Sequence, residues 1–264
     1  MSVNSGAADP SSSAGAGHLV PKRVGVLYPG FSGEEDYVLL EEVFGGQARF
    51  SVVHTYVGVD AHREDALRDV GSLDRLVHAC HEWGSDLPDS VMWACTSGSF
   101  IFGLAGAVAQ AQGLAEATGR PASSTSLAFV AALERLDASQ VSVVATYPGD
   151  ITAKFVEFLS DANIRAVASE SLEILTGAEV GRLELERIRD VIRSARHGGS
   201  DAVVMPDTAL RAIDIVNELE VLVGRPVLTA NQVTAWYGLN LAGSCVTSGR
   251  LGALFASSTR RSQA

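Results

Sequence analysis

The sequence predicts an α/β protein made of two similar Rossmann-like (flavodoxin-like) halves, whose parallel sheets are related by a pseudo-twofold axis. Two observations support this prediction. Short apolar runs rich in β-branched residues alternate with longer helical patterns, and the order of motifs in the first half recurs in the second. Strands that alternate with helices are typical of βαβ units, in which ligands bind at the carboxyl ends of the strands. The active site is therefore expected in the cleft between the halves.

The expected elements follow from the period of the apolar residues and from turn signals. The expected strands cover residues 23–28, 49–57, 90–94, 141–146, 165–168, 202–205 and 227–229. The expected helices cover residues 34–44, 64–83, 99–118, 124–136, 151–163, 179–197, 208–223 and 234–242. Residues 91–115 carry no charge, but their glycines, hydroxyls and internal turn favour a strand, a turn and a buried helix over a membrane span.

An internal repeat organises the chain. The Tyr-Pro-Gly triplet at residues 28–30 recurs at 147–149, and Arg-Pro at 120–121 recurs at 225–226. Between these motifs, the strand and turn that contain Cys95 match the strand and turn that contain Asp207. The triplet and the dipeptide are also ordinary turn signals, but three matches in the same order favour duplication. Equivalent loops then face each other, which places the thiol and the carboxyl on opposite sides of one bound molecule.

The repeat also defines the expected domain limits. The first half spans residues 21–138 and the second spans 139–256, with the C-terminal segment as a candidate to pack back on the first half. Residues 1–20 contain no Lys or Arg and are rich in Ser, Ala and Gly. They are therefore expected to be a disordered tail rather than a secretion signal. Residues 257–264 are expected to be a second tail.

Charge and cysteine content narrow the class of partner. The chain has 20 Lys and Arg against 31 Asp and Glu, and a net charge of −11, which argues against nucleic-acid and membrane partners. Its 3 cysteines have no Cys-x-x-Cys spacing and indicate a reduced, cytoplasmic protein. The 6 histidines show no metal-ligand spacing, and nucleotide-binding and serine-hydrolase motifs are absent. No metal is therefore expected.

Cys95 is the first candidate catalytic residue. It follows an expected strand and precedes an expected helix, so free backbone amides and the helix dipole should lower its pKa and favour a nucleophilic or basic thiolate. Thr96 and Ser97, with the amide that follows them, are suited to hold a carboxylate. The alternative for Cys95 is a buried core cysteine. Cys80 and Cys245 lack this setting and are expected to be core or surface thiols.

Asp207 and Tyr147 are the further candidate catalytic residues. A carboxyl and a thiol that flank one carbon can deliver a proton on one face and remove it on the other. The alternative for Asp207 is the N-cap of a helix that starts near Thr208. The phenol of Tyr147 is suited to donate to an oxyanion or a carboxylate, and the alternative is an ordinary aromatic lid, as for Tyr28.

Taken together, the duplicated halves, Cys-Thr-Ser at 95–97 and Pro-x-x-Ser-Thr-Ser at 121–126 resemble the aspartate/glutamate racemase superfamily. The most similar branch is that of the maleate cis-trans isomerases and arylmalonate decarboxylases, and the resemblance covers residues 22–256. It implies a cofactor-independent enzyme in which one thiol from each half flanks the substrate. In maleate isomerases the first thiol attacks the double bond, whereas in arylmalonate decarboxylases the second protonates an enediolate.

The resemblance assigns Cys95 to the first thiol and implies a set of substrate-binding positions. These are Pro29, Ser32, Thr96, Ser97, Thr125, Thr208 and Ala209, with Tyr147 as a further donor. The sequence departs from the pattern twice, because Asp207 replaces the second cysteine and Ser32 replaces an asparagine of maleate isomerases. A carboxyl has a much lower ordinary pKa than a thiol, so Asp207 repels an anionic substrate unless it keeps a proton.

The sequence therefore predicts a cofactor-independent isomerase of the maleate cis-trans isomerase type, acting through Cys95 on a small carboxylate or dicarboxylate. An arylmalonate-type decarboxylase or an aspartate/glutamate-type racemase that uses the same loops is the alternative. A non-catalytic small-carboxylate-binding protein is the alternative from another class, since the second cysteine is replaced. The sequence is compatible with a homo-oligomer.

Overall fold

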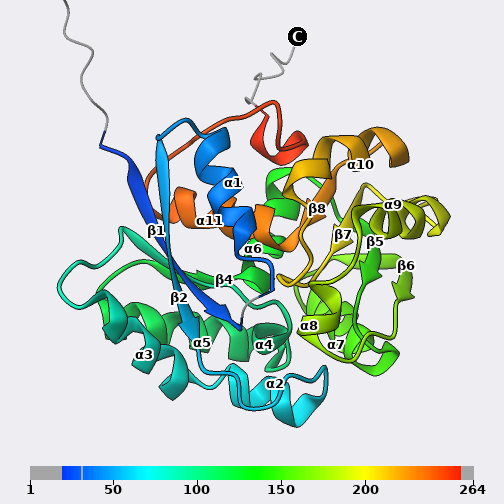
Figure 1. Ribbon diagram of the computed structural model, residues 1–264. Helices are drawn as coiled ribbons and strands as arrows, with labels where there is room; N and C mark the ends of the chain where they lie inside the picture. The colour runs from blue at the N-terminus through cyan, green and yellow to red at the C-terminus, as the bar shows by residue number, and fades with distance from the viewer. Residues whose placement is uncertain (1–19, 31, 257–264) are drawn as a thin grey trace, which may run out of the picture.

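Two four-stranded parallel sheets form the framework of this computed structural model, which describes residues 20–30 and 32–256 (Figure 1). The first sheet has the order β2-β1-β3-β4 and contains β1 (Lys22–Pro29), β2 (Ala48–Thr55), β3 (Ser90–Trp93) and β4 (Ala122–Ser124). The second has the order β6-β5-β7-β8 and contains β5 (Gln140–Ala145), β6 (Arg165–Ser171), β7 (Ala202–Met205) and β8 (Val227–Thr229). All paired strands are parallel. The two orders are equivalent, and the predicted α/β class with two similar halves is confirmed.

Helices connect the strands. They are α1 (Glu35–Val43), α2 (Glu64–Val70), α3 (Leu73–Cys80), α4 (Ser97–Phe100), α5 (Gly103–Thr118), α6 (Thr125–Arg135), α7 (Gly149–Asp161), α8 (Gly177–Val180), α9 (Leu185–Ser194), α10 (Val216–Val223) and α11 (Ala230–Leu241). Short 3₁₀ helices are η1 (His81–Trp83), η2 (Ile213–Ile215) and η3 (Ala253–Phe255). None of the helices in the described part of the chain combines the length and the hydropathy that crossing a bilayer requires. The expected tails lie outside the described residues, apart from Val20.

Three expected helices are interrupted. The helix expected over 64–83 is divided at Gly71, where a Cβ would lie 2.0 Å from the carbonyl oxygen of Gly98. This close approach of α2 to α4 requires glycine, and it is a tertiary contact that the local sequence does not reveal. The helices expected over 99–118 and 179–197 are likewise divided, the first into α4 and α5 and the second into α8 and α9.

Two further elements differ from expectation. β4 occupies residues 122–124, which the sequence analysis left without a strand. The helix expected over 208–223 begins only at Val216, because the preceding loop is held by other contacts. Asp207 has a φ of +107° and accepts a hydrogen bond from the Ala209 amide, and the Ala212 amide donates to Asp36. Asp207 is therefore not the N-cap of a helix.

The inner strands β1, β3, β5 and β7 are buried on both faces, which explains why their sequences are nearly continuous apolar runs. Alternate residues of β1 face opposite ways. Val26 belongs to a cluster shared with the second sheet, whereas Leu27 packs with residues of α3. In the same way, Val143 of β5 belongs to the shared cluster, and Val144 packs with residues of α9 and α10. The shared cluster also includes residues of α6, α7 and α11, so the two halves have one central core.

The last helix of the second half packs against the first sheet. α11 contacts α6, β1 and β3, and Figure 1 shows α11 and α6 in the middle of the molecule. The Ser90 hydroxyl donates to the Gly238 carbonyl at 2.7 Å. A Cβ on Gly238 would lie 2.5 Å from Cγ1 of Val24 and 2.9 Å from Cγ of Met92. The absence of a side chain at Gly238 permits this close approach.

A buried polar network at the start of α11 connects the halves. Asn231 Nδ2 donates to Asp36 Oδ2 at 2.9 Å and to the Thr208 carbonyl at 3.0 Å. The Tyr28 hydroxyl donates to the same carbonyl at 2.7 Å. Burial raises the pKa of Asp36 to about 6, although the hydrogen bonds from Asn231 and the Ala212 amide partly offset the increase. The network fixes the loop after β7 against the first half.

Replacing Gly238 with Ala should lower the free energy of unfolding by about 1–3 kcal/mol, because Val24 and Met92 must move to accommodate the methyl group. Urea unfolding followed by circular dichroism measures the change. Gly198→Ala is the control, since a Cβ there meets no atom within 4 Å. Equal stabilities of the two variants would contradict the tight seating of α11 on the first sheet.

Candidate active site

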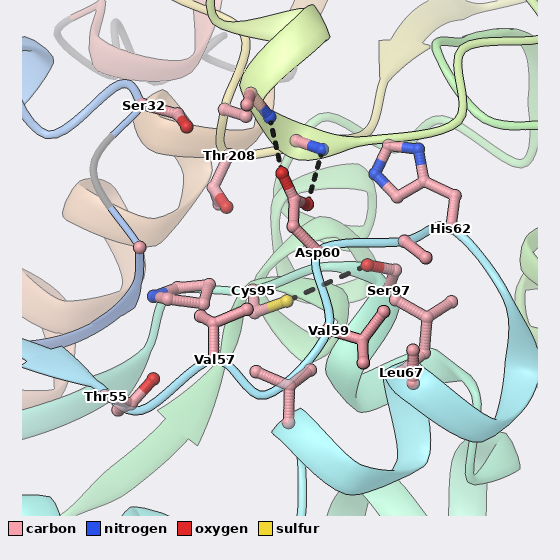
Figure 2. A pocket seen from close by; sticks show the side chains of 18 of the residues that line it. Ser32, Thr55, Val57, Val59, Asp60, His62, Leu67, Cys95, Ser97 and Thr208 are labelled. Atoms are coloured by element: carbon pink, nitrogen blue, oxygen red, sulfur yellow. Dashed lines mark hydrogen bonds between the residues drawn. The ribbon is translucent and has the colours of Figure 1, made fainter.

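A cavity of about 750 Å³ lies where loops at the carboxyl ends of strands from both halves meet. Its walls come from the loops after β1, β2, β3 and β7, together with α2 and the first residues of α8. Figure 2 shows side chains of the first half, such as Cys95 and His62, around the same space as Thr208 of the second half. The site therefore occupies the place that parallel α/β sheets favour for ligands.

Most of the predicted site residues reach this cavity. Those that line it are Pro29, Ser32, Cys95, Ser97, Asp207, Thr208 and Ala209. Cys95 and Asp207 come from equivalent loops, after β3 and β7. The repeat thus brings together the thiol and the carboxyl as the sequence analysis expects.

Thr96, Thr125 and Tyr147 do not line the cavity. Thr125 is fully buried, and its hydroxyl lies 2.6 Å from the hydroxyl of Thr234, where it joins α6 to α11. Thr125 was predicted to contact the substrate, but its hydroxyl instead contacts Thr234 inside the protein. The Thr96 hydroxyl accepts a hydrogen bond from the Asp207 amide at 3.2 Å. Thr96 thus connects the two loops directly.

Tyr147 lies behind the cavity wall. Its ring packs edge-on against His62, with a centroid distance of 4.8 Å, and against Phe100 at 5.8 Å. Its buried hydroxyl lies near the hydroxyls of Thr96 and Ser97 but makes no hydrogen bond of normal geometry. Burial raises the pKa of this phenol well above its ordinary value, so Tyr147 is a neutral donor.

The thiol of Cys95 is protonated and therefore neutral near pH 7. Burial raises its pKa to about 12, and the charge of Asp207 contributes to the increase. The Gly98 amide donates to Sγ at 3.2 Å, and the Ser97 hydroxyl lies 3.8 Å away, but these contacts only partly offset desolvation. The expectation of a lowered pKa is wrong, because the thiol is 7% exposed and α4 has only 4 residues to form a dipole.

Asp207 is buried in a strained backbone conformation. Its φ of +107° is rare for a residue with a side chain. Oδ1 accepts from the Ala209 amide at 2.9 Å, and Oδ2 accepts from the Thr146 hydroxyl at 2.5 Å. Burial raises the pKa of the carboxyl, while His62, Thr146 and the Ala209 amide oppose the increase.

The loop 56–63, after β2, was not predicted as part of the site. Asp60 accepts hydrogen bonds from the amides of Gly177 and Ala178 at 2.8 and 3.0 Å, which tie this loop to α8 of the second half (Figure 2). His62 Nε2 lies 3.7 Å from Asp207 Oδ2. The topology could have indicated this loop. It follows a parallel strand, so it must lie at the same edge of the sheet as Cys95.

The cavity wall combines apolar side chains with hydroxyls, two histidines and two acids. Its apolar part includes Val57, Val59, Leu67 and Val70, and its acids are Asp60 and Asp207. None of the described residues that line the cavity is Lys or Arg. Over the described ranges, no three His, Cys, Asp or Glu side chains are grouped to hold a metal ion.

The arylmalonate decarboxylase family profile matches residues 46–255. An arylmalonate decarboxylase of Bordetella bronchiseptica is 28% identical over 151 residues, which are 56% of this chain and 62% of that protein. A maleate isomerase of Geobacillus stearothermophilus is 27% identical over 117 residues, 44% of this chain and 47% of that protein. The chain thus spans less than two thirds of the length of these curated relatives.

Solved structures share the fold. A maleate isomerase variant from Pseudomonas putida with maleate has a TM-score of 0.83 and 19% identity, covering 90% of this chain and 98% of that chain. A Nocardia farcinica maleate cis-trans isomerase with a covalently bound succinylcysteine intermediate has a TM-score of 0.80 and 22% identity, covering 89% and 98%.

Because its pKa is raised, Cys95 should react slowly with iodoacetamide at pH 8, and the rate should rise about tenfold per pH unit up to pH ~9.5 as the thiolate fraction grows. Mass spectrometry of the alkylated peptides measures this rate, with the exposed Cys245 as the internal reference. A Cys95 rate that is already constant between pH 7 and 8 would refute the neutral thiol.

Replacing Asp60 with Ala should release the loop 56–63, because two hydrogen bonds to α8 are lost. The expected cost is about 1 kcal/mol in the free energy of unfolding, with faster amide hydrogen exchange in residues 56–63 and 175–180. Asp65→Ala is the control, since the side chain of Asp65 bonds to its neighbour Arg63 and, among the described residues, makes local contacts and none with the second half. Unchanged exchange in both segments would rule out this connection.

Proposed function

This chain belongs to the arylmalonate decarboxylase family, and we propose that it is a cofactor-independent isomerase that acts on a small carboxylate through Cys95. The observation that carries the proposal is the placement of Cys95 and Asp207 on equivalent loops around one cavity. A nucleophile and a proton donor on opposite sides of one carbon skeleton support addition to a double bond and its reversal.

The proposed reaction adds the thiol across a carbon–carbon double bond. The bond between Sγ and one carbon forms, and the electron pair of the double bond moves toward the carboxylate of the substrate as an enediolate. Asp207 gives its proton to the neighbouring carbon, and the proton released by Cys95 restores Asp207. The former double bond is now a single bond, and rotation about it interconverts the two isomers. The reverse steps then release the isomer and regenerate the thiol.

Hydroxyls are the proposed partners of the substrate carboxylate. Ser32, Ser97 and Thr208 line the cavity from both halves, and a hydroxyl donates to a carboxylate without adding charge. Because the lining holds no Lys or Arg among the described residues, we favour a substrate that presents one carboxylate to these hydroxyls. The proposed location is the cytoplasm, supported by three cysteines that form no disulfide.

Decarboxylation is the second candidate function, and the apolar wall favours it. A second carboxylate placed against Val57, Val59 and Leu67 loses hydration, and desolvation disfavours its charge. Loss of CO₂ moves that charge, with the bonding electron pair, from the apolar wall to the remaining carbon, where the other carboxylate delocalises it as an enediolate. Protonation of this carbon by Asp207 or Cys95 completes the reaction.

Proton NMR of small acids in D₂O tests the proposal. We expect the protein to isomerise, decarboxylate or deuterate at least one acid in a panel of maleate, phenylmalonate and aspartate. Cys95→Ser should lower the rate about 10³-fold or more, and Asp207→Asn about 10²-fold. Cys245→Ser is the matched control, because that thiol is exposed and remote from the cavity lining.

The pattern of products separates the functions. Fumarate from maleate supports the isomerase, and a deuterated monoacid from phenylmalonate supports the decarboxylase. An unchanged rate in Cys95→Ser would refute the role of the thiol. Binding of an acid without any turnover would instead support the non-catalytic binding protein.

A further inference from the structure

His62 is a buried titratable residue of the cavity to which the proposed reaction gives no role. Its side chain is 6% exposed and comes from the loop 56–63. Its backbone amide donates to the Leu175 carbonyl at 2.7 Å, and Nδ1 lies 2.8 Å from the Ile174 carbonyl oxygen. Both carbonyls belong to the second half, so the ring is fixed across the cleft.

The bond to Ile174 determines which ring nitrogen carries the proton. A carbonyl oxygen only accepts, so Nδ1 must donate to it. In the neutral ring Nε2 then bears a lone pair, which faces Asp207 Oδ2 at 3.7 Å. This distance exceeds a hydrogen bond, but acid–base contacts in unliganded sites commonly shorten when substrate binds.

The geometry favours one proton between Nε2 of His62 and Oδ2 of Asp207. The Thr146 hydroxyl and the Ala209 amide donate to the carboxyl group, but with a neutral imidazole and an anionic carboxylate the lone pairs of Nε2 and Oδ2 would still face each other in a buried place. A proton on either atom removes this repulsion. Whichever atom carries the proton, the net charge of the two residues together is zero.

Among the described residues that line the cavity, none beside the histidines offers a positive charge. Asp60 faces Asp207 and raises its pKa. The charge of Asp207 contributes to the raised pKa of Cys95, Tyr147 and Tyr28. These three groups are neutral when protonated. The ring of Tyr147 is packed edge-on against His62. Among the described residues of the lining, His62 is thus the group in contact with Asp207 that can compensate its charge.

We propose that His62 and Asp207 form a proton-sharing pair that replaces the second thiol of the site, with His62 as the positioning residue. This inference rests on the proposed function. In the proton-transfer step the O–H bond of Asp207 breaks and a C–H bond forms on the substrate carbon. The proton released by Cys95, or one from water, then returns to the pair, so the carboxyl need not face an anionic substrate as a free anion.

Two variants separate the bond to Ile174 from the contact with Asp207. In His62→Asn, the side-chain amide can keep the donor to the Ile174 carbonyl but offers no group in place of Nε2. In His62→Gln, the amide can reach Asp207 but holds no titratable proton. His197→Asn is the matched control, because His197 is half-buried and bonds to the Ile192 carbonyl and Ser142, outside the cavity lining.

The first measurement is the carboxyl ¹³C shift of Asp207 against pH in the full chain, with the signal assigned by Asp207→Asn. His62 lowers the pKa of Asp207, so its removal should raise the midpoint by about 1 pH unit in His62→Asn. The rise should be smaller in His62→Gln, where an amide donor that reaches Asp207 favours the charged carboxylate. His197→Asn should leave the midpoint unchanged. This measurement needs no substrate.

The second measurement uses whichever panel acid is turned over. His62→Asn and His62→Gln should lower kcat about 10²-fold with little change in KM, and the limb of the pH profile that reports Asp207 should move upward with the NMR midpoint. An unchanged midpoint and an unchanged kcat in both variants would overturn the pair. If no acid is turned over, the proposed function fails and the ¹³C midpoint alone decides whether the pair exists.

Discussion

The seating of α11 on the first sheet is the contact on which the geometry of the site depends. Gly238 lets this helix approach Val24 and Met92, and its first turn carries Asn231 into the buried network with Asp36 and the Thr208 carbonyl. That network holds the loop after β7, and with it Asp207, against the first half. Together with the hydrogen bond between Thr96 and Asp207 and the bonds of Asp60 to α8, it fixes the distance between the thiol and the carboxyl.

Desolvation is the dominant electrostatic effect in the resulting site. It raises the pKa of Cys95, of Asp207 and of Tyr147 together, so the unliganded cavity favours neutral groups. A net charge of −11 repels anions at long range. Hydroxyls in the lining and a protonated Asp207 reduce that repulsion where the substrate is held, and a raised Asp207 pKa is compatible with a proton donor.

The internal repeat made much of the site predictable. Because Cys95 and Asp207 occupy equivalent turns, the sequence indicated that they share a cavity, and the structure places both there. The same repeat contained a signal for β4, since residues 120–126 match 225–231, where β8 was expected. Thr125 could not be assigned from sequence, because its neighbour Thr234 is 109 residues away along the chain.

The sequence by itself determined the α/β class, the two-fold repetition of the halves and the pairing of Cys95 with Asp207, because these follow from periodicity and motif order. Only the tertiary structure decided the protonation of the thiol and the presence of His62. The residues that bury Cys95 are distant from it in sequence. No local motif therefore indicates that its pKa is raised. His62 meets Asp207 across 145 positions of chain because the loop after β2 of the first sheet and the loop after β7 of the second sheet line the same cavity.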